Sequence, residues 1–147
     1  MGIRKIAKKD LKRCSEILTA CYGMPPYNDK FQGKNAILYI ESKFKVCKDS
    51  SFLIENGKKK IVGFIFGSIS YWTNGKQALL EELCVDPNYH KMGYGSKLFD
   101  YMNNYMKKNG AKSAMLWVNK NAPALKLYEK KGYEVSNDSK IMYKNIK

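Results

Sequence analysis

The segment 80–98 constrains the fold of this chain more than any other part of the sequence. Residues 80–85 have the composition of a strand, and a loop with Gly93 and Gly95 leads from them into residues that recur at helical spacing: Leu98, Phe99, Met102 and Met106. Glycines let a ligand approach the backbone closely, and loop N–H groups and a helix N-terminus both attract negative charge. The segment therefore predicts an α/β protein with an anion cradle at this loop, and a pyrophosphate is a ligand that suits it.

Two better-known phosphate motifs do not fit the same residues. A dinucleotide-binding fingerprint requires a third glycine where Leu98 stands. A P-loop ends in glycine, lysine and then serine or threonine, whereas this chain has Gly95, Ser96 and Lys97 in another order. The cradle therefore belongs to neither motif.

The rest of the pattern places this segment in a mixed sheet. It predicts strands at 2–7, 52–55, 60–71, 76–85 and 113–118, and helices over 11–21, from about 34, from 93 and over 122–131. Asp10 is a candidate N-cap, and Asn56-Gly57 indicates a hairpin. Strands near 133–135 and 141–144 would complete the order β-α-α-β-β-β-α-β-α-β-β. We expect an α/β (α+β mixed sheet) fold, with one domain over 1–147, a mostly antiparallel N-terminal half and helices on both faces.

Length and composition exclude several classes of protein. With 147 residues, 44% of them hydrophobic, the chain is not globally disordered. No apolar run approaches the ~18–20 residues of a membrane span, and residues 1–12 lack a signal-peptide stretch. We therefore expect a soluble, cytoplasmic protein with no membrane partner. Four cysteines and one histidine lack zinc-site spacing, so we expect free thiols and no metal.

The formal net charge of +14 leaves the type of partner open. Such a field attracts nucleic acid, an anionic membrane or a phosphorylated cofactor. Lysines spread along a chain also simply keep its surface soluble. Charge alone does not choose a function here.

Two blocks of residues resemble one known family. The pattern Val85-x-Pro87-x-Tyr89-His90-x-x-Gly93-x-Gly95 is similar to the acyl-CoA loop of the GNAT superfamily of N-acyltransferases. A second block, with Asn121, Ala124, Tyr128-Glu129 and Gly132-Tyr133, resembles the family's N…A…LYEKxGF segment. The two blocks stand in the family's order, and the resemblance covers essentially all of the chain.

This resemblance implies a set of residues that bind acetyl-CoA. Backbone groups of Leu83, Cys84 and Val85 would pair with the pantetheine arm as an added strand does, and one N–H would polarise the thioester carbonyl. Asn121 and Ala124 would line the other side of the CoA. Tyr128 would stand near the sulfur and protonate the departing thiolate. The residues expected at the pyrophosphate are Lys91, Met92, Gly93, Tyr94, Gly95 and Ser96.

His90 departs from the family's pattern, which usually has arginine or glutamine at this position. Arginine would carry a permanent charge near the pyrophosphate, whereas a neutral histidine offers one N–H. The backbone cradle remains, so we expect weaker or pH-dependent CoA affinity rather than a loss of binding. A surface position with no role is the alternative for His90.

Glu81 and Glu82 are the candidate catalytic carboxylates. An amine with a pKa near 10.4 must lose a proton before it attacks a thioester. Neighbouring residues of a regular strand face opposite sides, so a bulge would be needed to bring both carboxylates into reach. In several small-amine acetyltransferases of the family, such a pair supplies a base and a binding group for the cation. We favour Glu81 as the base, with Glu82 close behind it.

Aromatic residues supply candidate walls for the acceptor pocket, although such residues are more often core. A pocket of this kind would pack the carbon skeleton or the cation of an amine. Cys84 has no evident base partner, and we do not expect it to form an acyl-enzyme. The candidate walls are Tyr22, Tyr27, Phe31, Tyr71, Trp72 and Trp117.

The sequence thus predicts an N-acetyltransferase that moves an acetyl group from acetyl-CoA to a primary amine of a small molecule, by direct attack in a ternary complex. A toxin-type enzyme that acetylates aminoacyl-tRNA is a second hypothesis, favoured by the charge. It is disfavoured by the carboxylate pair, which such enzymes commonly lack. A non-enzymatic module that binds acyl-CoA or nucleic acid is a third. A homodimer is also consistent with the resemblance.

Overall fold

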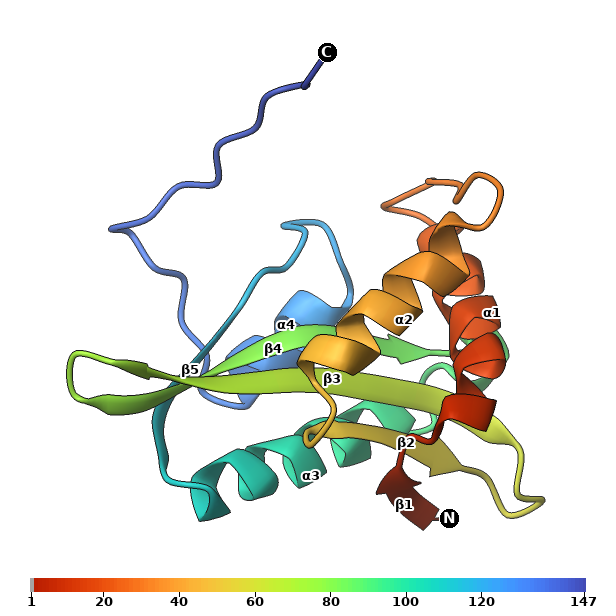
Figure 1. Cartoon of the computed structure of the whole chain (residues 1–147), viewed down its shortest axis with the longest axis horizontal. Helices are drawn as coiled ribbons and strands as arrows, with labels where there is room; N and C mark the ends of the chain where they lie inside the picture. The colour runs from red at the N-terminus through yellow and green to blue at the C-terminus, as the bar shows by residue number, and fades with distance from the viewer. Residues whose placement is uncertain (1) are drawn as a thin grey trace.

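A computed structural model describes residues 2–147, and its five strands form one sheet in the order β1-β2-β3-β4-β5 (Figure 1). Neighbouring strands are antiparallel except β4 and β5, which are parallel. The α/β class with an antiparallel N-terminal half is therefore confirmed. The strands are β1 (Gly2–Lys5), β2 (Ser51–Glu55), β3 (Ile61–Trp72), β4 (Gly75–Val85) and β5 (Ala111–Leu116).

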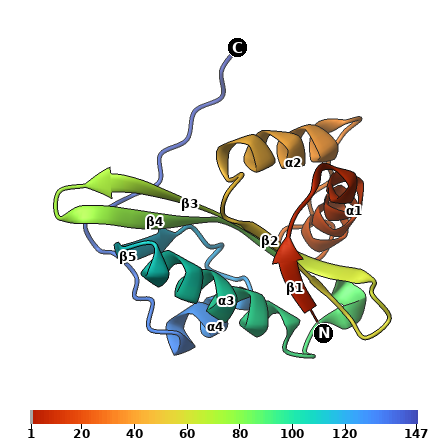
Figure 2. The same ribbon diagram turned by 60° about the horizontal axis from the view of Figure 1, so that its bottom comes forward.

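Helices cover both faces of this sheet (Figure 2). Helices α1 (Leu11–Tyr22) and α2 (Asn35–Val46) lie on one face, and α3 (Tyr94–Lys108) and α4 (Ala124–Lys130) lie on the other. Two short 3₁₀ turns, η1 (Lys8–Asp10) and η2 (Pro87–Tyr89), precede α1 and α3.

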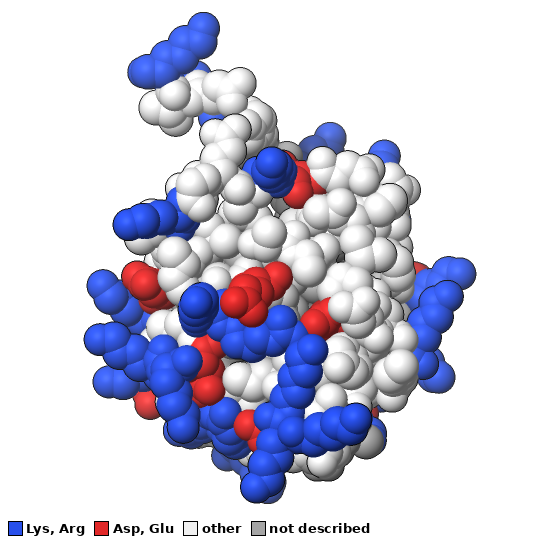
Figure 3. Space-filling model, turned by 90° about the vertical axis from the view of Figure 1, so that its right-hand side faces the viewer, with Lys and Arg blue, Asp and Glu red and all other residues white. Residues whose placement is uncertain are grey.

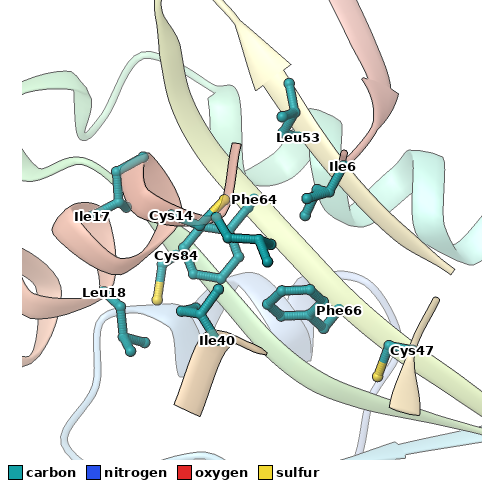
Figure 4. Close-up of a cluster of buried hydrophobic side chains, with 11 residues drawn as sticks. Ile6, Cys14, Ile17, Leu18, Ile40, Cys47, Leu53, Phe64, Phe66 and Cys84 are labelled. Carbon is teal, nitrogen blue, oxygen red and sulfur yellow. The ribbon is translucent and has the colours of Figure 1, made fainter. Parts of the chain in front are cut away.

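Each face has its own apolar core. Beneath α1 and α2, Phe64 and Phe66 of β3 pack with Ile17, Leu18 and Ile40 of the helices (Figure 4). On the other face, the residues that sequence spacing assigned to one stripe of α3 are all buried: Leu98, Phe99, Met102 and Met106. The alternation of β3 divides its side chains between the two cores.

A bulge in β4 changes which face its residues present. Phe66 pairs with Glu82 while the next residue, Gly67, pairs with Leu80, so Glu81 has no partner on β3. Leu80 and Leu83 contact the α3 core, whereas Glu81 and Glu82 both reach side chains of α1 or α2. The extra residue therefore places two adjacent carboxylates on the same face, as a bulge was expected to do.

The sheet opens between β4 and β5. Their pairing ends at Leu80 and Leu116, while β4 continues to Val85 in pairing with β3. Residues 81–85 of β4 therefore keep an edge free on the β5 side. This edge leads directly into the loop that precedes α3.

The structure corrects one sequence expectation, the strands near the C-terminus, and refines another. No strand forms near 133–135 or 141–144; the described chain beyond Gly132 has no strand and projects from the body (Figure 1). Beyond Tyr133 its apolar side chains are exposed, and Met142 is 93% exposed. Asp10 is the N-cap residue of α1, as predicted, but its carboxylate makes no cap hydrogen bond; it accepts from the Ala7 N–H at 2.8 Å and from Arg4, and so stabilises the preceding turn.

Candidate active site

A pocket of about 260 Å³ lies between the end of α1, the loop after it, α2 and β4. Tyr22, Phe31 and Tyr39 supply aromatic walls, and Glu82 is the carboxylate contributed by the sheet. Rings in this cluster contact one another: the centroids of Tyr22 and Phe31 are 5.9 Å apart. Asp29 and Lys30 complete the lining. The pocket therefore combines apolar walls with an acidic group.

Glu82 is held by two phenol groups. The Tyr39 hydroxyl donates to its Oε1 at 2.9 Å, and the Tyr22 hydroxyl donates to its Oε2 at 3.0 Å. Burial raises the pKa of Glu82 above its ordinary value, and these hydrogen bonds only partly oppose that shift. A carboxylate with a raised pKa is a better proton acceptor at neutral pH. Glu82 therefore has the position and the environment of a general base.

Glu81 has a different environment. Lys43 of α2 donates to its Oε1 at 2.7 Å, and the Ser68 hydroxyl donates to its Oε2 at 2.6 Å. Burial would raise the pKa of Glu81, but these two partners outweigh it and the pKa is lowered. Its charge is thus neutralised, and it does not line the pocket. This geometry favours Glu82 over Glu81 as the base.

The loop after β4 has the shape expected of an anion cradle. Gly93 adopts φ +85° at the start of α3, a conformation that favours glycine, and nothing stands within 4 Å of the place of its missing side chain. Met92 and Lys91 beside it are exposed. The first turn of the 15-residue helix α3 contains Tyr94, Gly95 and Ser96. A helix of this length presents unpaired N–H groups and a positive dipole end to an anion.

The loop is fixed to the body through Asp86. Its carboxylate accepts from the Asn88 N–H at 3.0 Å and forms an ion pair with Arg13 of α1 at 2.6 Å. Arg13 also donates to the Ile61 carbonyl. The entrance to α3 is therefore held in place by contacts from two other elements.

The free edge of β4 offers Leu83 and Val85 to a ligand. The Asp86 N–H donates to the Val62 carbonyl of β3. Because every second residue of a strand directs its backbone groups to the same neighbouring strand, the N–H and C=O of Cys84 also face β3. The Cys84 carbonyl lies 3.0 Å from the place where a side chain on Gly63 would begin, which agrees with that orientation. The expected pairing of a pantetheine arm is thus left to the backbone of Leu83 and the N–H of Val85, since the Val85 carbonyl has partners within the protein. The Cys84 side chain is buried, and a hydrogen bond with Cys21 together with burial raises its pKa, which disfavours a nucleophilic thiolate.

His90 turns back toward the strand. Its Nε2 lies 2.7 Å from the Val85 carbonyl, so that nitrogen carries the proton and donates. The Cys21 thiol donates to the same carbonyl. The Nε2 of His90 therefore closes the end of β4 and does not point into the cradle.

Tyr128 of α4 packs against the core on the α3 face, as does Leu83 of β4. Its ring packs on Phe99 with centroids 5.3 Å apart. Burial raises its pKa, and the neighbouring Cys84 and Glu82 raise it further, so the phenol stays protonated. A protonated hydroxyl near Glu82 can act as an acid. Ala124, one turn earlier, is half-buried, and Asn121 is exposed before the helix.

The other aromatic candidates divide by location. Tyr27 stacks on Tyr22 at 4.7 Å, beside the pocket. Tyr71 and Trp72 lie at the far end of the β3–β4 hairpin and are 76% and 71% exposed, and Trp117 follows β5 and is 69% exposed. These three do not line the pocket, because strand direction carries them away from it.

Sequence reasoning missed Tyr39, Lys43 and Ser68. Tyr39 and Lys43 are four residues apart and so share one side of α2, where the Lys43 ammonium lies 5.7 Å from the Tyr39 ring. That spacing was the available signal. Nothing in the sequence showed which strand this side of the helix would meet.

No helix within residues 2–147 is both long and apolar enough to cross a bilayer. In the same part of the chain, no group of three or more His, Cys, Asp or Glu side chains could hold a metal ion.

A half-buried carboxylate beside an open strand edge, which leads into an anion cradle, is an arrangement suited to acyl transfer. Comparison with known proteins agrees with this class of reaction. Residues 11–133 match the model of the "Acetyltransferase (GNAT) family". The chain therefore belongs to the GNAT family of acetyltransferases.

A relative in Methanocaldococcus jannaschii, described as an uncharacterized N-acetyltransferase, is 32% identical over 138 residues. That alignment covers 90% of this chain, and the chain spans 60% of the length of the relative. A possible acetyltransferase from Clostridium difficile shares the fold, with TM-score 0.81 and 17% identity over 99% of this chain and 98% of that one. A putative acetyl transferase from Pyrococcus furiosus has TM-score 0.73 and 22% identity, covering 99% of both chains.

Proposed function

We propose that this protein transfers an acetyl group from acetyl-CoA, the donor typical of its family, to a primary amine of a small molecule. The observation that carries the proposal is Glu82, a carboxylate at the sheet side of an aromatic pocket, oriented by Tyr22 and Tyr39. Leu83 and Val85 together with the cradle from Lys91 to Ser96 would hold the donor. The donor supplies the activated acyl group.

The residues of the chain then account for the movement of protons. Glu82 accepts a proton from the bound amine, whose nitrogen forms the new bond to the acyl carbon while the carbon–sulfur bond breaks. Tyr128 gives its proton to the departing sulfur and regains one from solvent, and Glu82 releases to solvent the proton that it took from the amine. The backbone N–H groups at the β4 edge stabilise the charge that develops on the acyl oxygen. Both reactants are then bound together, because Cys84, whose thiol lies 3.9 Å from the Glu82 Oε2, is buried with a raised pKa and is a poor nucleophile.

The pocket also favours a particular kind of acceptor. Aromatic faces attract an ammonium group, and Glu82 can receive its proton. A volume of about 260 Å³ suits a small amine. The surface charge would serve the donor, since Lys and Arg dominate the lower part of the side on which β4 ends (Figure 3).

The test is release of CoA thiol from acetyl-CoA over a panel of small amines, peptides and aminoacyl-tRNA. Glu82→Gln should lower kcat by about 10²–10⁴-fold, the range for loss of a general base. Tyr128→Phe should also lower kcat. Glu81→Gln is the matched control, because it changes the adjacent carboxylate and should leave the chemical step less affected.

The panel separates the candidate functions. Release that depends on a small amine supports the proposal, whereas release only with aminoacyl-tRNA would support the toxin-type enzyme. Tight acetyl-CoA binding with no release on any acceptor would support a binding module. A larger effect of Glu81→Gln than of Glu82→Gln would contradict the assignment of the base.

A further inference from the structure

The hairpin of β3 and β4 extends beyond the rest of the sheet and leaves one edge of β3 without a neighbour (Figures 1 and 2). Strand β2 pairs with β3 only as far as Phe66, and Ser50 then bonds to both backbone groups of Gly67. Beyond Gly67, β3 pairs with β4 alone. By strand alternation, Ile69 and Tyr71 direct their N–H and C=O groups to the same open edge as Gly67.

A groove of about 440 Å³ follows this edge. Residues 68–71 all line it, although successive side chains of a strand face opposite sides. A cavity that contacts consecutive residues lies along the edge of a strand and not over one face. The wall on the α2 side includes Lys45 and Lys48, and the wall on the α3 side includes Tyr105 and Asn109.

The two walls differ in chemistry. Lys45 and Lys48 are exposed on the α2 side, and Asp49 is the acidic residue among the lining side chains. On the other side Lys76 donates to the Asn109 carbonyl at 3.0 Å, which leaves the Tyr105 ring as the less polar surface. A strand laid along the edge would therefore present alternate residues to a wall with two exposed lysines and to a partly aromatic wall whose lysine, Lys76, is hydrogen-bonded to Asn109.

We propose that this groove binds an extended acidic segment of another protein, which pairs with β3 as an added strand. Acidic and apolar residues alternate along this segment. Its acidic side chains face Lys45 and Lys48, and its apolar side chains face Tyr105. Main-chain hydrogen bonds to Ile69 and Tyr71 provide register, and the lysines provide selectivity. A second copy of this chain is disfavoured as the occupant, because its net charge is also +14.

The experiment uses the full chain and a capped heptapeptide of alternating Val and Glu. Binding is followed by peptide fluorescence anisotropy, and amide hydrogen exchange is measured at Ile69 and Tyr71. We expect the peptide to slow exchange at both amides by about tenfold or more, as formation of a strand ladder requires. Two further peptides carry N-methyl groups on the odd-numbered or on the even-numbered amides. Only one of the two should bind, because the amides of a strand point alternately to its two edges and a single edge pairs with β3.

Matched variants test the charge. Lys45→Glu combined with Lys48→Glu should weaken peptide binding by about tenfold and admit an alternating Val and Lys peptide. Lys58→Glu combined with Lys59→Glu, at the tip of the β2–β3 hairpin, makes the same charge change away from the groove and should alter binding by less than about twofold. Unchanged exchange at Ile69 and Tyr71, or equal effects of the two double variants, would overturn the proposal. Protection of these amides without peptide, together with a dimer in light scattering, or binding of an oligouridylate in place of the peptide, would also overturn it.

Discussion

The two adjacent glutamates of β4 show how neighbouring side chains acquire different properties. Glu82 is half-buried with phenol donors, and its pKa is raised, whereas Glu81 is paired with Lys43 and its pKa is lowered. The sequence singled out both carboxylates from the need for a base beside a thioester. It could not rank them, because their partners come from α1, α2 and β3, more than ten residues away in the chain.

We expect the Tyr22→Phe and Tyr39→Phe double variant to shift the acid limb of the kcat/KM profile to higher pH. The two hydroxyls stabilise the ionised form of Glu82, so their removal raises its pKa further. The active carboxylate is then lost at a higher pH as the solution is acidified. Tyr27→Phe, which removes a hydroxyl that does not contact Glu82, is the control. An acid limb identical to that of the native protein would contradict this account.

Lys43→Met should destabilise the fold by about 1–3 kcal/mol near neutral pH, because it leaves the Glu81 carboxylate buried with Ser68 alone. The pKa of Glu81 is lower in the folded state than in the unfolded state. Its ion pair therefore contributes its full stability above the unfolded-state pKa, and this contribution is lost as the pH falls through the folded-state pKa. The deficit of the variant should therefore shrink toward about pH 4. Urea denaturation at both pH values measures this. Lys45→Met on the exposed side of α2 is the control, and an equal deficit at both pH values would contradict the ion pair.

At the scale of elements, the site depends on how closely α3 and β4 approach β3. Gly63 of β3 makes that approach possible, since a side chain there would begin 3.0 Å from the Cys84 carbonyl and 3.1 Å from Leu98. The glycines before α3 were recognised from their place in a motif. Gly63 was not, because a glycine within an apolar run gives no sign of which backbone will pass beside it.

Gly63→Ala is expected to destabilise the protein by about 1–3 kcal/mol, the range for overpacking a close contact. The backbone carbonyl of Cys84 cannot move aside without disturbing the β3–β4 ladder. Gly57→Ala, at a hairpin tip with nothing within 4 Å, should change stability by less than about 0.5 kcal/mol. Equilibrium urea unfolding of both variants makes the comparison. A neutral Gly63→Ala would mean that the two strands are less closely joined than described.

For the whole molecule, sequence periodicity predicted the strands and helices up to Lys130 but not the course of the chain after it. Alternating apolar residues near Ile141 indicate a strand only if an edge is available to pair with them. Pairing depends on the partner as much as on the segment. The described chain leaves Val135, Ile141 and Tyr143 at least three-quarters exposed.

Deletion of residues 136–147 should therefore change the free energy of unfolding by less than about 0.5 kcal/mol, as expected for exposed positions. Tyr133→Ala should lower the free energy of unfolding by about 1–3 kcal/mol, because the Tyr133 ring packs against Phe99 with centroids 5.4 Å apart. Urea unfolding with both variants provides the measurement. A cost above about 2 kcal/mol for the deletion would show that these residues pair with the sheet in solution.

The bulge at Glu81 has a consequence for anyone who exchanges segments between this protein and its relatives. Even-numbered residues of β4 face α3 before this position, and odd-numbered residues face α3 after it. A graft that omits the extra residue would therefore turn every side chain on one side of the junction to the opposite face of the sheet. Such a chimera would turn apolar core residues outward although each transplanted residue matched its donor. A transplant of β4 should therefore extend from Gly75 to Val85 as one unit, with both glutamates included.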